Sequence, residues 1–141
     1  MRVEPLTRAW ARWFSTMDVT FYRMVGNLSP LNWNKLVLTT RGRQTGRQIS
    51  TPLLFLEREG KLYVVASFGG SDTAPAWYLN LVANPQVQVE RGRSRAPYRA
   101  RPLPPEEKKA IWASLVRVYP LYAHYQRRTT RDIPVVELTR I

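Results

Sequence analysis

The chain has 141 residues, of which 44% are hydrophobic and 11% aromatic, a composition typical of one packed globular domain. It has no cysteine and one histidine, which excludes disulfides, zinc fingers, iron–sulfur ligation and multi-histidine metal sites. The formal net charge is +12, and four of the 22 cations are lysine while the other 18 are arginine, so we expect an anionic partner: a nucleic acid, an acidic membrane surface or a phosphorylated small molecule.

Residues 1–25 are predicted to form an amphipathic helix, because apolar side chains recur there at helical spacing. We assign 1–30 to this N-terminal segment and 31–141 to a single barrel domain. The helix either packs on the barrel or lies at a membrane interface with Trp10, Trp13 and Phe14 inserted. No apolar run approaches the ~20 residues that span a bilayer, and no signal peptide is evident. We therefore expect a cytoplasmic protein with peripheral contact at the inner face of the cell membrane.

A strand is predicted over 36–40, followed by a compact turn at 41–47. Apolar runs at 52–58 and 62–67 predict a hairpin that turns at Glu59-Gly60. The remaining predicted elements are, in chain order, a loop at 67–71, a helix at 75–83, a hairpin of 86–90 with 94–103, helices at 104–118 and 121–128, and a strand at 134–139. Because hairpin-joined strands outnumber helices, a small antiparallel barrel with flanking helices is expected.

The turn Arg41-Gly-Arg-Gln-Thr-Gly-Arg47 is the first candidate binding feature. Its glycines let the backbone approach a ligand closely, and turn N–H groups can converge on an anion. Arg43 and Arg47 would add charge-assisted bonds, and Thr45 a hydroxyl donor. The pattern is neither a Walker loop nor a dinucleotide fingerprint, and an ordinary solvated turn is the alternative.

A second basic feature consists of five arginines at odd positions, Arg91, Arg93, Arg95, Arg99 and Arg101. Along one extended strand such side chains share a face. This face is either a solvated edge that resists strand aggregation or a binding surface for an anion.

Tyr119, Tyr122 and Tyr125 recur near one face of a predicted helix, beside His124. Such a stripe belongs either to the core or to the wall of a pocket, where each phenol would find a polar partner. No nucleophile elbow is present, and no carboxylate pair is placed for acid–base work. If the protein is an enzyme, a cofactor carries the reaction.

Taken together, these motifs resemble the deazaflavin-dependent nitroreductase family, split-barrel oxidoreductases that use coenzyme F420. The stretches that carry the resemblance are Thr39–Gly46, Thr51–Leu53, Val65–Gly70, Pro75–Asn80, Asn84-Pro85, Tyr119–Tyr125 and Arg131–Pro134. The resemblance implies an α+β, mainly β fold: a split β-barrel resembling the FMN-binding fold. It also implies an 8-hydroxy-5-deazaflavin with a phosphate and an oligoglutamate tail, and hydride transfer to an activated enone, quinone or nitroaromatic acceptor.

By the same resemblance, residues of four segments would hold the cofactor. They are Arg43, Gln44, Thr45, Gly46 and Arg47 at the phosphate and tail, Ile49, Ser50, Thr51, Pro52, Leu53 and Leu54 along the groove, Val65, Ala66, Ser67, Phe68, Gly69 and Gly70 at the ring, and Ala76, Trp77, Tyr78, Leu79 and Asn80 closing the site. Tyr122 and Ser67 would be the catalytic residues that orient or protonate the acceptor, with Tyr119 and Tyr125 on the substrate side. Solvent water is the alternative proton donor. Gln44 stands where close relatives often carry lysine, and Ile49 stands where a basic residue can occur. No metal is expected.

Two other classes of function are consistent with the residues alone. One is a basic nucleic-acid-binding barrel, supported by the net charge and the arginine row. The other is the same barrel with FMN in place of the deazaflavin, or a flavin or haem carrier without turnover. The motifs favour the reductase, so we expect a small-molecule acceptor, no nucleic acid, and a monomer or homodimer.

Overall fold

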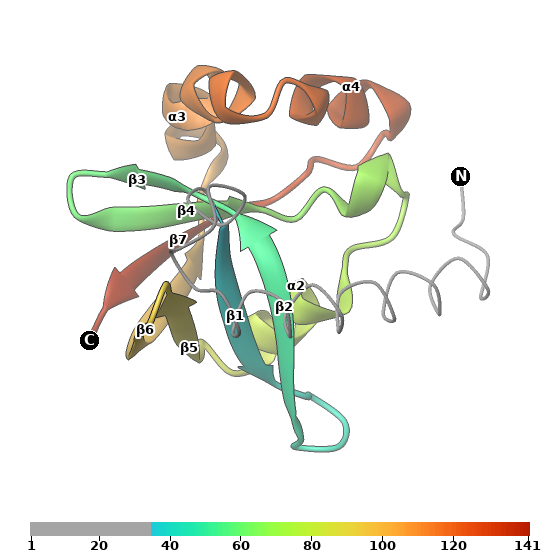
Figure 1. Ribbon diagram of the computed structural model, residues 1–141. Helices are drawn as coiled ribbons and strands as arrows, with labels where there is room; N and C mark the ends of the chain where they lie inside the picture. The colour runs from blue at the N-terminus through green and yellow to red at the C-terminus, as the bar shows by residue number, and fades with distance from the viewer. Residues whose placement is uncertain (1–34) are drawn as a thin grey trace.

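Residues 35–141 are described by the computed structural model, and their seven strands form a single antiparallel sheet (Figure 1). The predicted helix at 1–25 and the domain boundary at residue 30 lie outside the described residues. The strands are β1 (Lys35–Arg41), β2 (Gln48–Leu54), β3 (Leu56–Arg58), β4 (Lys61–Val65), β5 (Gln86–Arg91), β6 (Ser94–Pro102) and β7 (Val135–Arg140). Their order in the sheet is β2-β1-β5-β6-β7-β4-β3, so β2 and β3 form the two edges.

Helices cover both faces of this curled sheet. They are α2 (Ala76–Ala83), α3 (Pro105–Val118) and α4 (Leu121–Arg128). Figure 1 shows α3 and α4 together on one side of the sheet, with α2 on the other side, where it contacts β1 and β6. The prolines mark the helix starts as predicted, with Pro75 just before α2 and Pro105 in the first turn of α3.

The core is divided accordingly into two clusters. One lies between the sheet and α2 and includes Leu36, Val64, Trp77 and Leu81. The other lies between the sheet and the α3–α4 pair, and is made by Val65, Ile111, Leu115, Tyr122, Ile133 and Val135. Strand β7 contributes to both clusters because its successive side chains point to opposite faces.

The strand predicted over 52–58 is wrong as a single element. Leu54 ends β2, where it pairs with Lys35 of β1, whereas Leu56 begins β3, where it pairs with Tyr63 of β4. The chain therefore passes from one edge of the sheet to the other at Phe55. An unbroken apolar run hides this change of partner, because pairing partners are not written in the local sequence.

The hairpin between β3 and β4 turns at Glu59-Gly60 as predicted, with φ angles of 53° and 77°. The predicted loop at 67–71 contains a short 3₁₀ turn, η3 (Phe68–Gly70). The other predicted elements are confirmed to within a residue or two, and the antiparallel sheet with flanking helices is confirmed.

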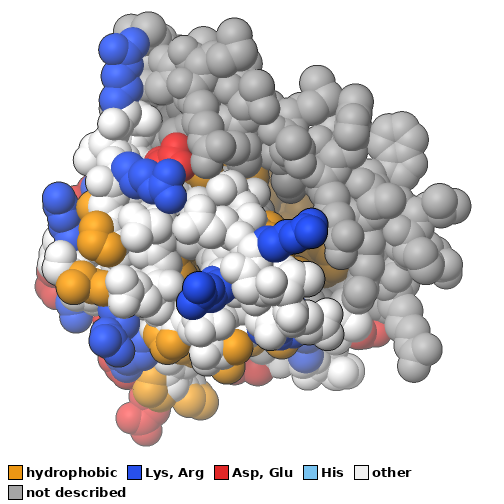
Figure 2. Space-filling view, turned by 90° about the horizontal axis from the view of Figure 1, so that it is seen from below, with side chains coloured by type: hydrophobic (Ala, Val, Ile, Leu, Met, Phe, Trp, Pro, Cys, Tyr) orange, Lys and Arg blue, Asp and Glu red, His pale blue; other side chains and the backbone are white. Residues whose placement is uncertain are grey.

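The arginine row differs from the prediction. Arg91 is on β5, Arg93 is in the turn, and Arg95, Arg99 and Arg101 share the exposed face of β6. The idea of a solvated sheet edge is wrong, since β6 lies inside the sheet between β5 and β7. Figure 2 shows Lys and Arg side chains spread separately over the face seen from below.

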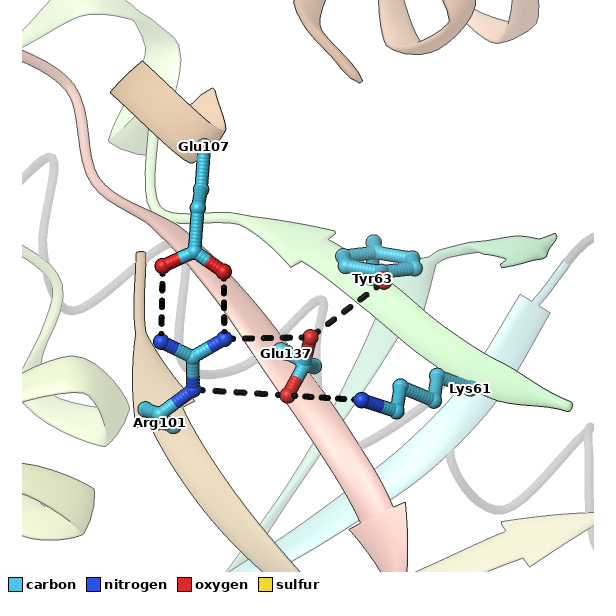
Figure 3. Close-up of polar contacts among 5 residues, drawn as sticks. All are labelled: Lys61, Tyr63, Arg101, Glu107 and Glu137. Atoms are coloured by element: carbon cyan, nitrogen blue, oxygen red, sulfur yellow. Dashed lines mark hydrogen bonds and ion pairs between the residues drawn. The ribbon is translucent and has the colours of Figure 1, made fainter. Parts of the chain in front are cut away.

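Arg101 belongs instead to a network of ion pairs around a buried carboxylate (Figure 3). Glu137 of β7 is only 7% exposed, and it accepts hydrogen bonds from Arg101 at 3.3 and 3.4 Å and from the Tyr63 hydroxyl at 3.3 Å. Lys61 Nζ lies 3.6 Å from the same carboxylate. Arg101 also binds Glu107 of α3 in a two-pronged pair at 2.8 and 2.9 Å. These contacts join β4, β6, β7 and α3.

Candidate functional site

The turn between β1 and β2 is closed by its own hydrogen bonds. The Gly42 N–H donates to the Arg47 carbonyl at 2.7 Å, and the Gly46 N–H donates to the Gly42 carbonyl at 2.8 Å. The Arg47 N–H donates to Thr45 Oγ1 at 3.2 Å. With these N–H groups engaged, the turn offers an anion mainly the exposed side chains of Arg43, Gln44 and Arg47.

Asn80 of α2 fixes the position of Arg43. Its side-chain oxygen accepts hydrogen bonds from both the main-chain N–H and Nη1 of Arg43, each at 3.2 Å. Its amide nitrogen donates to Thr40 Oγ1 at 3.3 Å, and the residue is only 1% exposed. Asn80 is therefore placed to act through Arg43 rather than by direct contact with a ligand.

The loop after β4 has an unusual backbone. Ser67 is in the right-handed helical region, whereas Phe68, Gly69 and Gly70 all have positive φ angles, of 44°, 64° and 79°. A phenylalanine in this region is strained by roughly 1–3 kcal/mol, and such strain is concentrated at functional sites. The left-handed turn is closed by bonds from the Gly70 N–H to the Ser67 carbonyl and from the Ser71 N–H to the Phe68 carbonyl.

The same loop presents three consecutive N–H groups. Within residues 35–141, the main-chain N–H groups of Ser67, Phe68 and Gly69 have no hydrogen-bond partner. A right-handed residue followed by a left-handed one turns successive N–H groups toward a common point, which favours an anion or an electron-rich acceptor. The loop thus forms a donor site, which we call the N–H cradle (Ser67–Gly69).

Helix α4 packs directly against this loop at Gly70. A Cβ added to Gly70 would lie 3.0 Å from the Tyr125 carbonyl oxygen and 3.2 Å from Arg128 Cβ. Only glycine permits this approach, so the contact fixes the spacing between the N–H cradle and α4.

The three tyrosines play different structural parts. Tyr122 is 6% exposed and packs in the core cluster under α3 and α4, and this burial raises the pKa of its hydroxyl. Within residues 35–141 that hydroxyl has no hydrogen-bond partner. Tyr119 and Tyr125 are half-buried, and their hydroxyls share a hydrogen bond of 3.3 Å. Tyr122 therefore belongs to the core, and Tyr119 and Tyr125 pack against the same cluster. A place for Tyr119 and Tyr125 in the wall of a pocket stays a prediction.

The remaining predicted cofactor residues differ in exposure. In β2, the side chains of 50–54 are half-buried and Ile49 is exposed, and the Ser50 and Thr39 hydroxyls share a hydrogen bond of 2.7 Å. In α2, Trp77 belongs to the core, whereas Leu79 is 38% exposed. The roles of these residues toward a cofactor stay predictions.

Sequence reasoning missed Arg131, which lies between α4 and β7. Its guanidinium donates hydrogen bonds to the carbonyls of Ala66, Ser67 and Ser71, all in the loop that holds the N–H cradle. The only sequence signal was its place in the stretch Arg131–Pro134. A carbonyl partner leaves no signature, because every residue has one.

Two further features concern the rest of the described chain. Residues 35–141 hold no group of three metal-ligating side chains, and their single histidine, His124, is exposed on α4. Within the same residues, no helix combines the length and the apolarity needed to cross a membrane.

The donors present fit a ligand with an anionic arm and a flat, acceptor-rich ring. Arg43 and Arg47 supply cations for phosphate or carboxylate, and the N–H cradle supplies neutral donors. Half-buried Tyr125 supplies aromatic surface on α4, which packs against the loop, and Tyr119 at the end of α3 adds a second ring beside it.

Comparisons with known proteins identify the family to which the chain is similar. The profile of the F420H(2)-dependent quinone reductase family matches residues 12–140. An F420H(2)-dependent quinone reductase of Mycobacterium tuberculosis strain H37Rv is 38% identical over 122 residues, which cover 82% of this chain and 80% of that protein.

Two solved structures are similar in both sequence and fold. An F420-H2 dependent reductase has a TM-score of 0.69 and 40% identity, covering 74% of this chain and 93% of that one. A structure described as a domain-swapped dimer has a TM-score of 0.71 and 35% identity, covering 86% and 96%. The split-barrel fold and the resemblance to F420-dependent reductases are confirmed. The chain belongs to the F420H(2)-dependent quinone reductase family.

Proposed function

We propose that the protein is an oxidoreductase that uses reduced coenzyme F420 to transfer a hydride to an electron-poor small molecule, with quinones as the leading acceptors. Family membership supports the cofactor and the type of reaction. The observation in the structure that supports it best is the N–H cradle packed against a tyrosine-bearing helix. Activated enones and nitroaromatics are the other acceptors to be compared.

Different residues would bind the two ends of the cofactor, the anionic tail and the ring. Arg43 and Arg47 would bind the phosphate and the carboxylates of the tail through charge-assisted hydrogen bonds. The N–H groups of Ser67, Phe68 and Gly69 would hold the ring through its oxygen and nitrogen acceptors. When bound, the reduced cofactor supplies a hydride from C5.

Proton supply and acceptor positioning would fall to Tyr122 and Ser67. The Tyr122 hydroxyl keeps its proton at neutral pH, as an ordinary phenol does, and burial raises its pKa further. Within residues 35–141 it has no partner to compete for that proton. Tyr119 and Tyr125 would pack on the acceptor and exclude water, which holds the reacting groups close together.

The cofactor assignment is tested by binding. Oxidised coenzyme F420, FMN and a labelled oligonucleotide are titrated in turn into the protein, and tryptophan quenching or anisotropy is followed. We expect tight binding of coenzyme F420, weak binding of FMN and salt-sensitive or no binding of the oligonucleotide. Tight binding to FMN or nucleic acid alone would show that the proposal is wrong.

Tyr122→Phe tests the proton role. Since the hydroxyl has no hydrogen-bond partner among the described residues, we expect the free energy of unfolding to change by less than about 0.5 kcal/mol. The turnover number with a quinone should fall about tenfold or more, with the dissociation constant of coenzyme F420 unchanged. Tyr98→Phe is the control, because Tyr98 is also buried but lies on β6 in the other core cluster. Unchanged turnover on every acceptor would exclude the role.

The state of assembly is predicted to be a monomer or a homodimer. The similar structure described as a domain-swapped dimer supports the homodimer. Size-exclusion chromatography with light scattering, read across a range of protein concentrations, distinguishes the two.

Peripheral membrane contact and the cytoplasmic location stay predictions, since the helix at 1–25 lies outside the described residues. Co-sedimentation with anionic vesicles tests the contact, comparing the wild type with a Trp10→Ala, Trp13→Ala double variant. Equal sedimentation of the two proteins would remove the assigned role of these tryptophans.

A further inference from the structure

Arg131 is tied to the loop after β4 by three hydrogen bonds. Its Nε donates to the Ser71 carbonyl at 2.7 Å, and its Nη2 donates to the Ser67 and Ala66 carbonyls at 2.9 and 3.1 Å. Arg131 is half-buried, and no carboxylate within residues 35–141 pairs with it. Its positive charge is therefore shared only with neutral carbonyl groups.

Those carbonyls belong to the peptide groups that form the N–H cradle. The Ala66 carbonyl and the Ser67 N–H are two ends of one peptide group, and the Ser67 carbonyl and the Phe68 N–H are two ends of the next. A cation bound at the carbonyl end polarises the peptide, so its N–H becomes a stronger donor. Arg131 therefore binds the carbonyl ends of two peptide groups, Ala66–Ser67 and Ser67–Phe68. The N–H ends of the same two peptide groups have no partner within residues 35–141.

Arg131 is itself held by α4 and its neighbours. Its N–H donates to Thr129 Oγ1 at 3.3 Å, and its carbonyl accepts a bond from Gln126 Nε2 at 2.8 Å. Gln126 Oε1 in turn accepts bonds from the Ile133 N–H at 2.9 Å and from Lys108 of α3 at 3.1 Å. The guanidinium is therefore positioned from both sides, by the loop and by the helices.

We propose that Arg131 is a positioning residue, which holds the strained loop in shape and strengthens the Ser67 and Phe68 N–H groups as donors to a negatively charged ring. This inference rests on the proposed function. The ring it concerns is the 8-hydroxy-5-deazaflavin, whose hydroxyl is acidic because the charge of its anion is delocalised across the conjugated ring. A cradle of polarised donors should favour that anion over the neutral ring.

The test uses Arg131→Gln, which removes the charge, and Arg131→Lys, which keeps the charge but has a single nitrogen to reach the carbonyls. Arg127→Gln is the matched control, since it removes a charge from exposed α4 surface. Two quantities are measured in each protein: the dissociation constant of oxidised coenzyme F420, by fluorescence quenching, and the pH midpoint of ring ionisation in the bound state, by absorbance.

We expect Arg131→Gln to raise the dissociation constant at least tenfold and to move the bound ring's pH midpoint up by about one unit. Arg131→Lys should lie between this variant and the wild type in both quantities, and Arg127→Gln should match the wild type. The other charged or titratable side chains around Arg131 and the loop are left unchanged: Asp72, Tyr78, Lys108, Tyr122, Tyr125, Arg128 and Asp132.

The pH midpoint separates the proposal from a purely structural role. A residue that only braced the loop would weaken binding without moving the midpoint of the ring that does bind, and that result would overturn the proposal. If Arg131→Gln does not fold, Arg131→Lys decides alone, because wild-type values of both quantities in it would overturn the proposal. Failure of the wild type to bind coenzyme F420 would instead refute the proposed function.

Discussion

Arg101 and Arg131 occupy opposite kinds of surroundings. Arg101 binds two carboxylates, those of Glu107 and Glu137, and with Lys61 these groups make a network of two cations and two anions (Figure 3). Arg131 binds three neutral carbonyls, and Arg43 binds the neutral oxygen of Asn80. A carboxylate cancels the charge of its arginine, whereas a carbonyl orients the arginine and leaves its charge free to act on a ligand.

This difference separates the arginines of residues 35–141 that face the candidate site from the arginine that stabilises the fold. The cations held by neutral oxygens adjoin the N–H cradle and the β1–β2 turn, where an anionic cofactor is expected. Arg101 instead stabilises the fold at the contact between the sheet and α3. We expect substitutions in the two regions to affect different measurements.

The largest effect on stability is expected for Glu137→Ala. It leaves Arg101, Lys61 and the Tyr63 hydroxyl without their shared buried acceptor, so the free energy of unfolding should fall by about 3 kcal/mol. Urea denaturation measures the change, with coenzyme F420 affinity of the folded protein unchanged. Glu57→Ala is the control, because Glu57 pairs with Arg91 at an exposed site and should lower stability by less than about 1 kcal/mol. Equal losses in both variants would contradict the assignment.

Asn80→Ala should affect both stability and binding. It leaves the Thr40 hydroxyl and the Arg43 main-chain N–H without their buried partner, which lowers the free energy of unfolding by about 2 kcal/mol. Arg43 also loses its orientation, so the dissociation constant of coenzyme F420 should rise severalfold, more so for longer glutamate tails. Asn84→Ala, one turn later on the chain, is the matched control. A stability loss with unchanged binding would show that Arg43 does not hold the tail.

The smallest effect is expected for Glu107→Gln, and it depends on pH. The hydrogen bonds from Arg101 hold the pKa of Glu107 below its ordinary value of 4.5. A carboxyl whose pKa is lower in the folded state adds stability above pH 4.5, and this contribution is lost as the pH falls through the lowered pKa. The difference in Tm between the wild type and Glu107→Gln should therefore be present at pH 7 and shrink toward pH 3. A difference that grows on acidification would contradict this sign.

The elements that could be predicted are those whose signals are local. The turn at Glu59-Gly60, the prolines before α2 and α3, and the alternation of arginine with buried Ala96, Tyr98 and Ala100 in β6 all depend on neighbours in the chain. The split at Phe55 was missed because it is decided by which distant strand pairs with each side.

In the candidate site too, local features could be predicted and features set by distant residues could not. The glycines of the two loops could be predicted as turn residues, but the positive φ of Phe68 and the bonds of Arg131 to Ala66 and Ser67 could not. Both are set by contacts between residues far apart in the sequence. For a similar reason the sequence alone left Tyr122 either in the core or in the wall of a pocket. A stripe of residues at helical spacing does not show which side chains pack over it.

The position of β7 has a consequence for the order of folding. This strand follows the other six in the chain, yet it lies inside the sheet between β6 and β4. During synthesis, the β1–β2, β3–β4 and β5–β6 hairpins can form early, but β4 and β6 keep exposed backbone edges until β7 leaves the ribosome. Such edges invite pairing with other chains. The nascent protein is therefore most open to aggregation, or to exchange of strands between two copies, just before this strand is complete.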